Sequence, residues 1–225
     1  MRDLLLNVCA PSIWVIVMGE VLISVGLLSN AKTTKNPVSW LSFFLTLGLI
    51  TDAALIGMGA ILSPEILEAV SPIRFIAHGI LIPLLFPICG YALKLKKKTM
   101  TVIWIVTAVI MTAGLAEALA TDLEAKEIAG VIRYASTDAT PAWARTISMV
   151  LSFGTVIPLM IAGLIVWIKQ KNPCLFLSGF FMFAFSALGP ATGNTDLIFC
   201  ISMFGELLMV LFLFLFSRRF RKSIL

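Results

Sequence analysis

Charged residues make up only 13% of this 225-residue chain, whereas apolar residues (Ala, Val, Ile, Leu, Met, Phe, Trp, Tyr and Cys) make up 60%. A soluble domain has about 25% charged and about 45–50% apolar residues. The shortage of charge excludes a water-soluble globule, because too little polar surface is available to cover it. The high apolar content equally excludes an intrinsically disordered chain. The composition therefore predicts an integral membrane protein.

Several signatures of chemistry are also missing. His78 is the only histidine, and the four cysteines form no Cys-x-x-Cys pair. Zinc sites usually combine several ligands of these types, so the sequence predicts no metal site. No phosphate-binding loop, dinucleotide fingerprint or serine nucleophile elbow is present, so we expect no cofactor and favour a non-enzymatic role. Three of the cysteines lie in or beside apolar runs and are interpreted as small apolar fillers.

Seven apolar runs are long enough to cross a bilayer, which needs about 20 mainly apolar residues. The runs are continuous and lack the alternation of barrel strands, so an all-α polytopic membrane protein is predicted. The whole chain, residues 1–225, is interpreted as one transmembrane domain. Its seven predicted spans cover residues 11–30, 38–62, 73–93, 100–120, 147–168, 174–190 and 196–217.

Basic residues gather in alternate connections of this predicted bundle. Lysines and arginines follow the first, third, fifth and seventh spans, and those stretches contain no acidic residue. Because cytoplasmic loops carry an excess of Lys and Arg, the N-terminus is predicted outside and the C-terminus in the cytoplasm. The expected location is the cell membrane. The net charge of +5 is thereby explained by topology, and no nucleic-acid partner is expected.

The connection over residues 121–145 is the longest on the outer side. Apolar residues recur there among charged ones, including Ile128, Val131 and Ile132. This pattern predicts a short amphipathic helix on the membrane surface, with Ile128 and Ile132 facing apolar surroundings. The alternative is a plain solvated connector.

Prolines and a glycine-rich stretch mark further boundaries. Pro83 and Pro87 predict a kink in the third span. Pro190 is expected to end the sixth span, and Asn194, Thr195 or Asp196 to cap the seventh. The stretch 186–196 is interpreted as a tight turn. The alternative is that its N–H groups line the mouth of a pocket, since helix starts readily bind anions.

Ionisable residues inside the spans are the main functional signal, because charge within a bilayer is costly. They fall in the outer half or at the midplane: Glu20, Asp52, Arg74, His78, Glu117, Asp196 and Glu206. Together with Asn194 they predict a ligand or proton pocket open to the outside, lined by the first, second, third, fourth and seventh spans. Arg74 and His78 share one helix face and are the expected partners of the carboxylates. The alternative is structural, with headgroup contacts and interhelical hydrogen bonds.

Arg74 lies nine residues before Pro83, which resembles the Arg-to-Pro spacing of microbial rhodopsins. The aspartate expected three residues after the arginine is Ala77 here, and the seventh predicted span has no lysine. No retinal Schiff base can form in that helix, so the likeness is one of topology at most.

The pocket favours a protein that binds a polar or cationic solute from the outer side, with a proton-coupled transporter as the leading interpretation. The first alternative is a sensor or an accessory subunit of a membrane complex. The second is an intramembrane enzyme that acts on a lipid through His78 and a carboxylate. Expected partners are membrane lipid and the solute, and a homo-oligomer or a larger membrane complex stays open.

Overall fold

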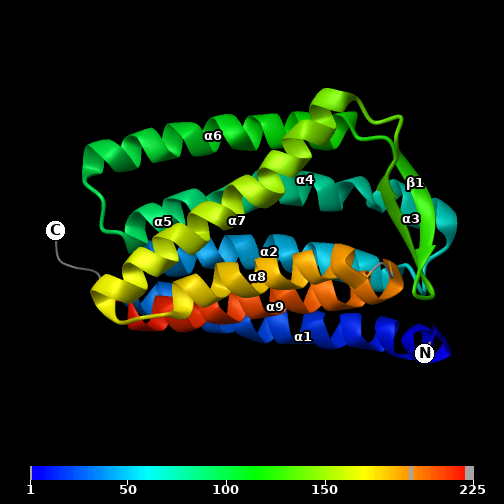
Figure 1. Cartoon of the computed structure of the whole chain (residues 1–225), viewed down its shortest axis with the longest axis horizontal. Coiled ribbons are helices and arrows are strands. Elements are labelled where there is room, and N and C mark those ends of the chain that lie inside the picture. The colour runs from blue at the N-terminus through cyan, green and yellow to red at the C-terminus, as the bar shows by residue number, and fades with distance from the viewer. Residues whose placement is uncertain (1, 193–194, 221–225) are drawn as a thin grey trace.

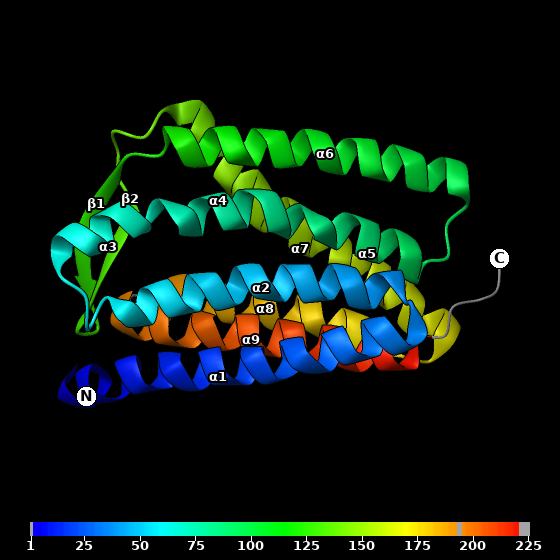
Figure 2. The ribbon, with the colours of Figure 1, turned by 180° about the vertical axis from the view of Figure 1, so that it is seen from behind.

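The computed structural model describes residues 2–192 and 195–220, with side chains described for residues 8–186 and 201–220. The chain is mostly helical, and most of its long helices run roughly along one axis (Figure 1). Helix α7 crosses the others obliquely, while α1 and α6 lie at opposite edges (Figure 2). The helices are α1 (Arg2–Thr34), α2 (Pro37–Met58), α3 (Pro64–Val70), α4 (Pro72–Leu81), the 3-10 turn η1 (Ile82–Leu84), α5 (Leu85–Ala92), α6 (Lys97–Ala120), α7 (Ala142–Gln170), α8 (Cys174–Thr192) and α9 (Thr195–Arg219).

Within the described residues, six helical segments are long and apolar enough to cross a membrane. They comprise α1, α2, the combined α3–α5 segment, α6, α7 and α9, while the described apolar part of α8 is shorter, Cys174–Ser186. Many side chains on the outside of the bundle are apolar, as on α1 with Val15, Met18 and Leu22. Lipid tolerates such a surface and water does not. The predicted mostly helical fold is confirmed, with one exception among the connections, and the six apolar helices of spanning length fit a multi-pass membrane protein.

Short loops join consecutive helices at the end of the bundle that carries the lysine-rich connections. The chain leaves α1, α5 and α7 through left-handed backbone at Lys35, Lys94 and Lys171, with φ of 51°, 54° and 53°. Such a residue ends a helix by turning the chain out of the helical path. Asn36 then caps α2, because its side chain accepts a hydrogen bond from the Val38 amide at 2.9 Å.

The third predicted span is interrupted at Pro83. Pro83 has no N–H to continue the helical pattern, and the 3-10 turn η1 separates α4 from α5 there. The α-helical hydrogen-bonding pattern is therefore interrupted at Pro83, where the kink was predicted. Pro87 instead lies in the first turn of α5, where a missing N–H costs little. The prediction that Pro190 ends its helix is wrong, since α8 continues to Thr192: a proline near a helix end removes one hydrogen bond without forcing a stop.

Residues 121–145 contain a β-hairpin, so the amphipathic helix predicted there is wrong. Strand β1 (Leu123–Ile128) pairs antiparallel with β2 (Val131–Ser136), and only Ala129 and Gly130 connect them. Both connecting residues have positive φ, 51° and 76°, which is the backbone that two-residue hairpin turns require. Tertiary packing reinforces the strands, because Ile128 and Val131 contact an apolar cluster between α1 and α2. Ile132, predicted to face apolar surroundings, is exposed.

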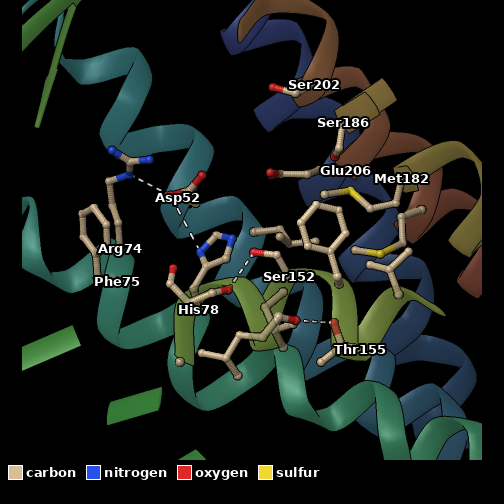
Figure 3. A pocket seen from close by; sticks show the side chains of 18 of the residues that line it. Asp52, Arg74, Phe75, His78, Ser152, Thr155, Met182, Ser186, Ser202 and Glu206 are labelled. Atoms are coloured by element: carbon tan, nitrogen blue, oxygen red, sulfur yellow. Dashed lines mark hydrogen bonds and ion pairs between the residues drawn. The ribbon is translucent and has the colours of Figure 1, made fainter. Parts of the chain in front are cut away.

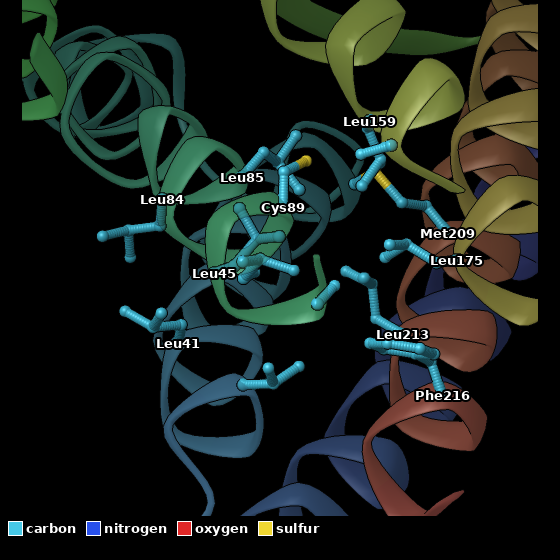
Figure 4. Packing of buried hydrophobic residues seen from close by; sticks show 14 of the residues in the cluster. Leu41, Leu45, Leu84, Leu85, Cys89, Leu159, Leu175, Met209, Leu213 and Phe216 are labelled. Atoms are coloured by element: carbon cyan, nitrogen blue, oxygen red, sulfur yellow. The ribbon is translucent and has the colours of Figure 1, made fainter. Parts of the chain in front are cut away.

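Two apolar clusters divide the interior. The larger lies towards the lysine-rich end and joins α2, α5, α7, α8 and α9 through residues such as Leu45, Leu85 and Leu213 (Figure 4). The smaller lies under the hairpin and joins α1, α2 and α9 through Ile13, Ile56 and Met203, among others. Asp52 on α2 and Glu206 on α9 each lie between a residue of one cluster and a residue of the other along their helix. The polar site described below therefore lies between the two apolar clusters.

Helices α4 and α6 touch backbone to backbone at one point. A Cβ atom on Gly79 would lie 2.5 Å from the carbonyl oxygen of Gly114, and a Cβ on Gly114 would lie 2.5 Å from that of Gly79. Only glycine at both positions permits this approach. Gly79 directly follows His78, and Gly114 precedes Glu117 by three residues. The contact therefore holds two candidate site residues on facing helices.

The cysteines differ in state. Cys9 is disulfide-bonded, whereas Cys89 and Cys174 are buried free thiols within the larger apolar cluster. Cys89 and Cys174 therefore fit the interpretation of cysteines in apolar runs as small apolar fillers. The N-terminus and the hairpin lie at the same end of the bundle (Figure 1), so the covalent link of Cys9 is at the end opposite the lysine-rich loops.

Candidate functional site

A cavity of about 470 Å³ lies among α2, α4, α6, α7, α8 and α9, with the hairpin contributing to its wall. Its apolar walls include Phe75 and Met182 (Figure 3). Met209 also lines it. Its polar lining residues are Asp52, Arg74, His78, Glu117, Arg133, Ser148, Ser152, Thr155, Ser186, Ser202 and Glu206. Cavities of about 300–1,000 Å³ with apolar walls and a few convergent polar groups are typical of small-molecule sites.

The fold brings five of the eight sequence-predicted site residues into this cavity, namely Asp52, Arg74, His78, Glu117 and Glu206. Glu20 is fully buried on α1 but does not line the cavity. Asn194 lies outside the described residues, and Asp196 falls in the first turn of α9 with its side chain outside them. Among the described residues, α1, the predicted first span, contributes none to the cavity lining, whereas α7 and α8, in the predicted fifth and sixth spans, do.

A buried ion pair forms one wall of the cavity. Nε of Arg74 donates to Oδ1 of Asp52 at 2.7 Å, and both side chains are almost fully shielded, at 11% and 6% exposure. Arg74 also donates to the backbone carbonyl of Tyr134 at 3.3 Å, which ties α4 to the hairpin. One turn along α4, Nδ1 of His78 lies 3.9 Å from the same oxygen of Asp52. Asp52 is thus the centre of a cluster of cationic and imidazole groups.

Across the cavity, the carboxyl group of Glu206 is buried and incompletely hydrogen-bonded. Its side chain is 8% exposed, and within the described part of the chain its Oε2 finds no hydrogen-bond partner. Neither carboxyl oxygen of Glu20 has a partner among the described residues either. Burying such groups without a hydrogen bond or counter-charge is costly. Both side chains interact electrostatically with Asp52, so the interior holds more acidic groups than the fold itself satisfies.

Glu117 approaches the cavity from the end of α6. The Thr121 hydroxyl donates to the Glu117 carbonyl at 2.8 Å and lies 3.3 Å from its Oε1, so the next helical turn holds this side chain in place. Glu117 is buried, at 6% exposure. Its position extends the acidic lining from α2 and α9 to α6.

Sequence reasoning missed Arg133, because the segment that carries it was interpreted as a surface helix. On β2 this side chain lines the cavity. Burial, and after it the charge of Arg74, lower the pKa of Arg133 below the usual arginine range. A hairpin prediction for this connection would have been the only signal to find it.

Sequence reasoning also missed the polar face of α7. Ser148, Ser152 and Thr155 all line the cavity, and their spacing of four and three residues puts them on one helix face. Ser152 and Thr155 donate to backbone carbonyls one turn earlier, at 3.0 and 2.7 Å. Their oxygens remain able to accept hydrogen bonds from a donor in the cavity. The spacing was visible in the sequence but is common in membrane helices.

Three lining residues come close enough to share a ligand. One candidate donor atom from each of Asp52, His78 and Glu206 lies within 4.8 Å of the other two. They come from α2, α4 and α9, which are separated in the sequence and are held together by packing. No local motif could have indicated this grouping.

No protein-family model matches this chain, and comparison with curated proteins finds no match either. The chemistry of the cavity therefore has to carry any functional assignment.

Proposed function

We propose that this chain is a seven-span membrane protein that binds a polar or cationic solute in the cavity and couples its movement across the membrane to protons. The observation that carries the proposal is the acidic lining of the cavity, one oxygen of which lacks a hydrogen-bond partner. Asp52, Glu117 and Glu206 all reach the cavity and are buried, and Oε2 of Glu206 has no hydrogen-bond partner in the described structure.

Two features support a seventh span and the predicted orientation. Helix α8 has 19 residues, so it is roughly 28 Å long at 1.5 Å per residue, close to the thickness of the bilayer core of about 30 Å. The lysine-bearing loops lie at one end of the bundle and the disulfide-bonded Cys9 at the other. Disulfides persist in oxidising compartments, and lysines mark the cytoplasmic side. Both arguments support the proposed orientation, in which the hairpin and the N-terminus are outside.

Cysteine labelling tests this orientation. Glu124 on the hairpin and Lys97 at the start of α6 are both exposed. A membrane-impermeant maleimide added to intact cells is expected to label Glu124→Cys but not Lys97→Cys, and permeabilisation should expose the second. The free thiols Cys89 and Cys174 are buried and give little background. Labelling of Lys97→Cys alone in intact cells would contradict the proposed orientation.

Charge favours a cation over an anion as the solute. Three carboxyl groups line the cavity against the guanidinium groups of Arg74 and Arg133, and Arg74 is already paired with Asp52. The buried carboxyl group of Glu20 adds to the acidic side. An incoming cation would offset the cost of these buried groups, whereas an anion would increase it. Glu206 lines the cavity and its Oε2 has no hydrogen-bond partner among the described residues, so it is the group best suited to release a proton when a cation binds.

Ligand-induced stabilisation tests the binding step. The purified full chain in nanodiscs is heated with guanidinium, choline, putrescine or Mn²⁺, and with acetate as the anionic comparison. A ligand that binds only the folded state at about 100 times its Kd stabilises it by about 2.7 kcal/mol. We expect at least one cation to raise the Tm of the wild type, and Glu206→Gln to abolish that rise.

Two further results decide the proposal. Glu124→Gln removes an exposed acid of the hairpin and should respond like the wild type. In proteoliposomes, an inward gradient of the stabilising cation should change the internal pH, read by a trapped dye. A chain that none of the cations stabilises, or a stabilising cation that moves without any change in internal pH, would contradict the binding or the coupling step respectively.

A further inference from the structure

We infer that Asp52, His78 and Glu206 form a binding site for a divalent transition-metal ion such as Zn²⁺ or Mn²⁺. The inference rests on the proposed function and narrows it, because the metal ion would be the cationic solute. The sequence alone argued against a metal site, since His78 is the only histidine. The fold supplies the missing ligands from two other helices.

The geometry of the three side chains is close to that of a bound site. Their candidate ligand atoms lie within 4.8 Å of one another. Around a tetrahedral zinc ion with bonds of about 2.0–2.2 Å, ligand atoms are about 3.3–3.6 Å apart. The three side chains would therefore have to approach one another by little more than about one ångström to bind such an ion.

The ligand set selects the class of metal. Imidazole nitrogen suits zinc and other first-row transition metals, whereas Ca²⁺ and Mg²⁺ prefer oxygen ligands alone. His78 with two carboxylates gives one nitrogen and at least two oxygen ligands. Three protein ligands also leave an open position for water, as in catalytic zinc sites but not in closed structural ones.

An independent observation points to an ion at this position. Glu206 is more than nine-tenths buried, and no described residue hydrogen-bonds to its Oε2. In Figure 3 its carboxyl group extends into the space that also contains Asp52 and His78. A metal ion bound there would satisfy this oxygen.

The surroundings of the three residues suit a bound cation. Arg74 donates to Asp52 at 2.7 Å, in the manner of the outer groups that orient metal-ligating carboxylates. In the charge balance, the carboxyl groups of Glu20, Asp52, Glu117 and Glu206 exceed the guanidinium groups of Arg74 and Arg133 by two. A divalent ion would bring the buried charges close to neutrality.

Metal stoichiometry tests the inference directly. The purified full chain is stripped with a chelator, equilibrated with Zn²⁺ or Mn²⁺, separated from free metal and analysed by mass spectrometry of the metal. About one ion per chain is expected for the wild type. His78→Gln and Glu206→Gln should each weaken binding by at least about 100-fold, since loss of a ligand exceeds the about 10–100-fold effect of losing an outer-shell partner. Glu124→Gln on the exposed hairpin should bind like the wild type.

Two readouts keep the test independent of folding. The His78 side chain is 38% exposed and makes no short contact with Asp52, so His78→Gln should keep the wild-type elution profile and Tm without metal. Cobalt absorption then reports ligation: the d–d bands of Co²⁺ bound to the wild type should change or vanish in His78→Gln. Metal binding that is equal in the wild type, His78→Gln and Glu206→Gln would overturn the inference, as would no binding of Zn²⁺, Mn²⁺ or Co²⁺.

The organic cations separate this inference from the broader proposal. If guanidinium, choline or putrescine stabilises the chain in a Glu206-dependent way while no metal binds, only the metal site is refuted. If neither metals nor organic cations bind, the metal site and the proposed function both fall.

Discussion

Replacing Gly79 or Gly114 with alanine is expected to destabilise the protein by about 1–3 kcal/mol, and replacing either with leucine by more. In each case the new Cβ would lie 2.5 Å from the carbonyl oxygen of the facing helix, well inside contact distance. Backbone atoms cannot rotate away as a side chain can, so α4 and α6 must separate. Thermal unfolding in detergent, monitored by helical circular dichroism, measures the loss.

Gly154→Ala on α7 is the matched control. Its new Cβ would meet only a side-chain methyl of Val150, at 3.4 Å, which is an ordinary contact. Alanine also has the better helix propensity by about 1 kcal/mol. This variant should therefore keep or raise the wild-type Tm. Similar losses from Gly154→Ala and Gly114→Ala would show that the close approach of α4 and α6 is not the cause.

The separation of α4 and α6 should also change the geometry of the cavity. His78 precedes Gly79 and lines the site, so moving α4 away from α6 also changes the position of the imidazole relative to Glu117. We expect cation-dependent stabilisation to be weaker in Gly114→Ala than in Gly154→Ala. Helix packing outside the ligand-binding residues would then control the geometry of the site.

The sequence predicted the helices better than the connections, and the physical reason is length. A run of about 20 apolar residues has few structural alternatives, because lipid requires backbone hydrogen bonds within the segment. The connection 121–145 carries no such constraint. Its apolar residues fit a helical period as well as strands, and Ala129-Gly130 lacks the Asn-Gly or Asp-Gly signal of a two-residue turn. Pairing of β1 with β2 and packing on α1 and α2 decided the outcome.

The sequence predicted only those residues of the candidate site whose burial in a membrane span is energetically costly. Asp52, Arg74 and Glu206 stand out because an ionisable group inside an apolar run is expensive. Their partners do not stand out. Arg133 reaches the cavity only because the hairpin folds back, and the grouping of Asp52, His78 and Glu206 joins three helices. These contacts depend on tertiary packing and therefore cannot be predicted from the sequence of any one segment.

Breaking the ion pair between Asp52 and Arg74 should cost about 3–5 kcal/mol of folding free energy, because each single substitution leaves a buried charge without its partner. Asp52→Asn and Arg74→Met are the variants, since both keep most of the side-chain volume. The double variant should be less destabilised than the sum of the two single ones, and the difference measures the coupling between the two groups. Chemical unfolding of the purified chain at neutral pH gives the three values.

The exposed pair of Arg145 and Asp138 is the control for that cycle. Its nitrogen and oxygen atoms are 3.6 Å apart, and solvent screens both side chains. Arg145→Met should cause no measurable change, as is usual for surface ion pairs. Arg133 is unsuitable as this control, although it lies on the hairpin, because its side chain lines the cavity. If Arg74→Met and Arg145→Met had equal small effects, Arg74 would not compensate the buried charge of Asp52. Arg74 would then not hold Asp52 as a carboxylate in the cavity, although both the proposed solute site and the proposed metal site use that carboxylate.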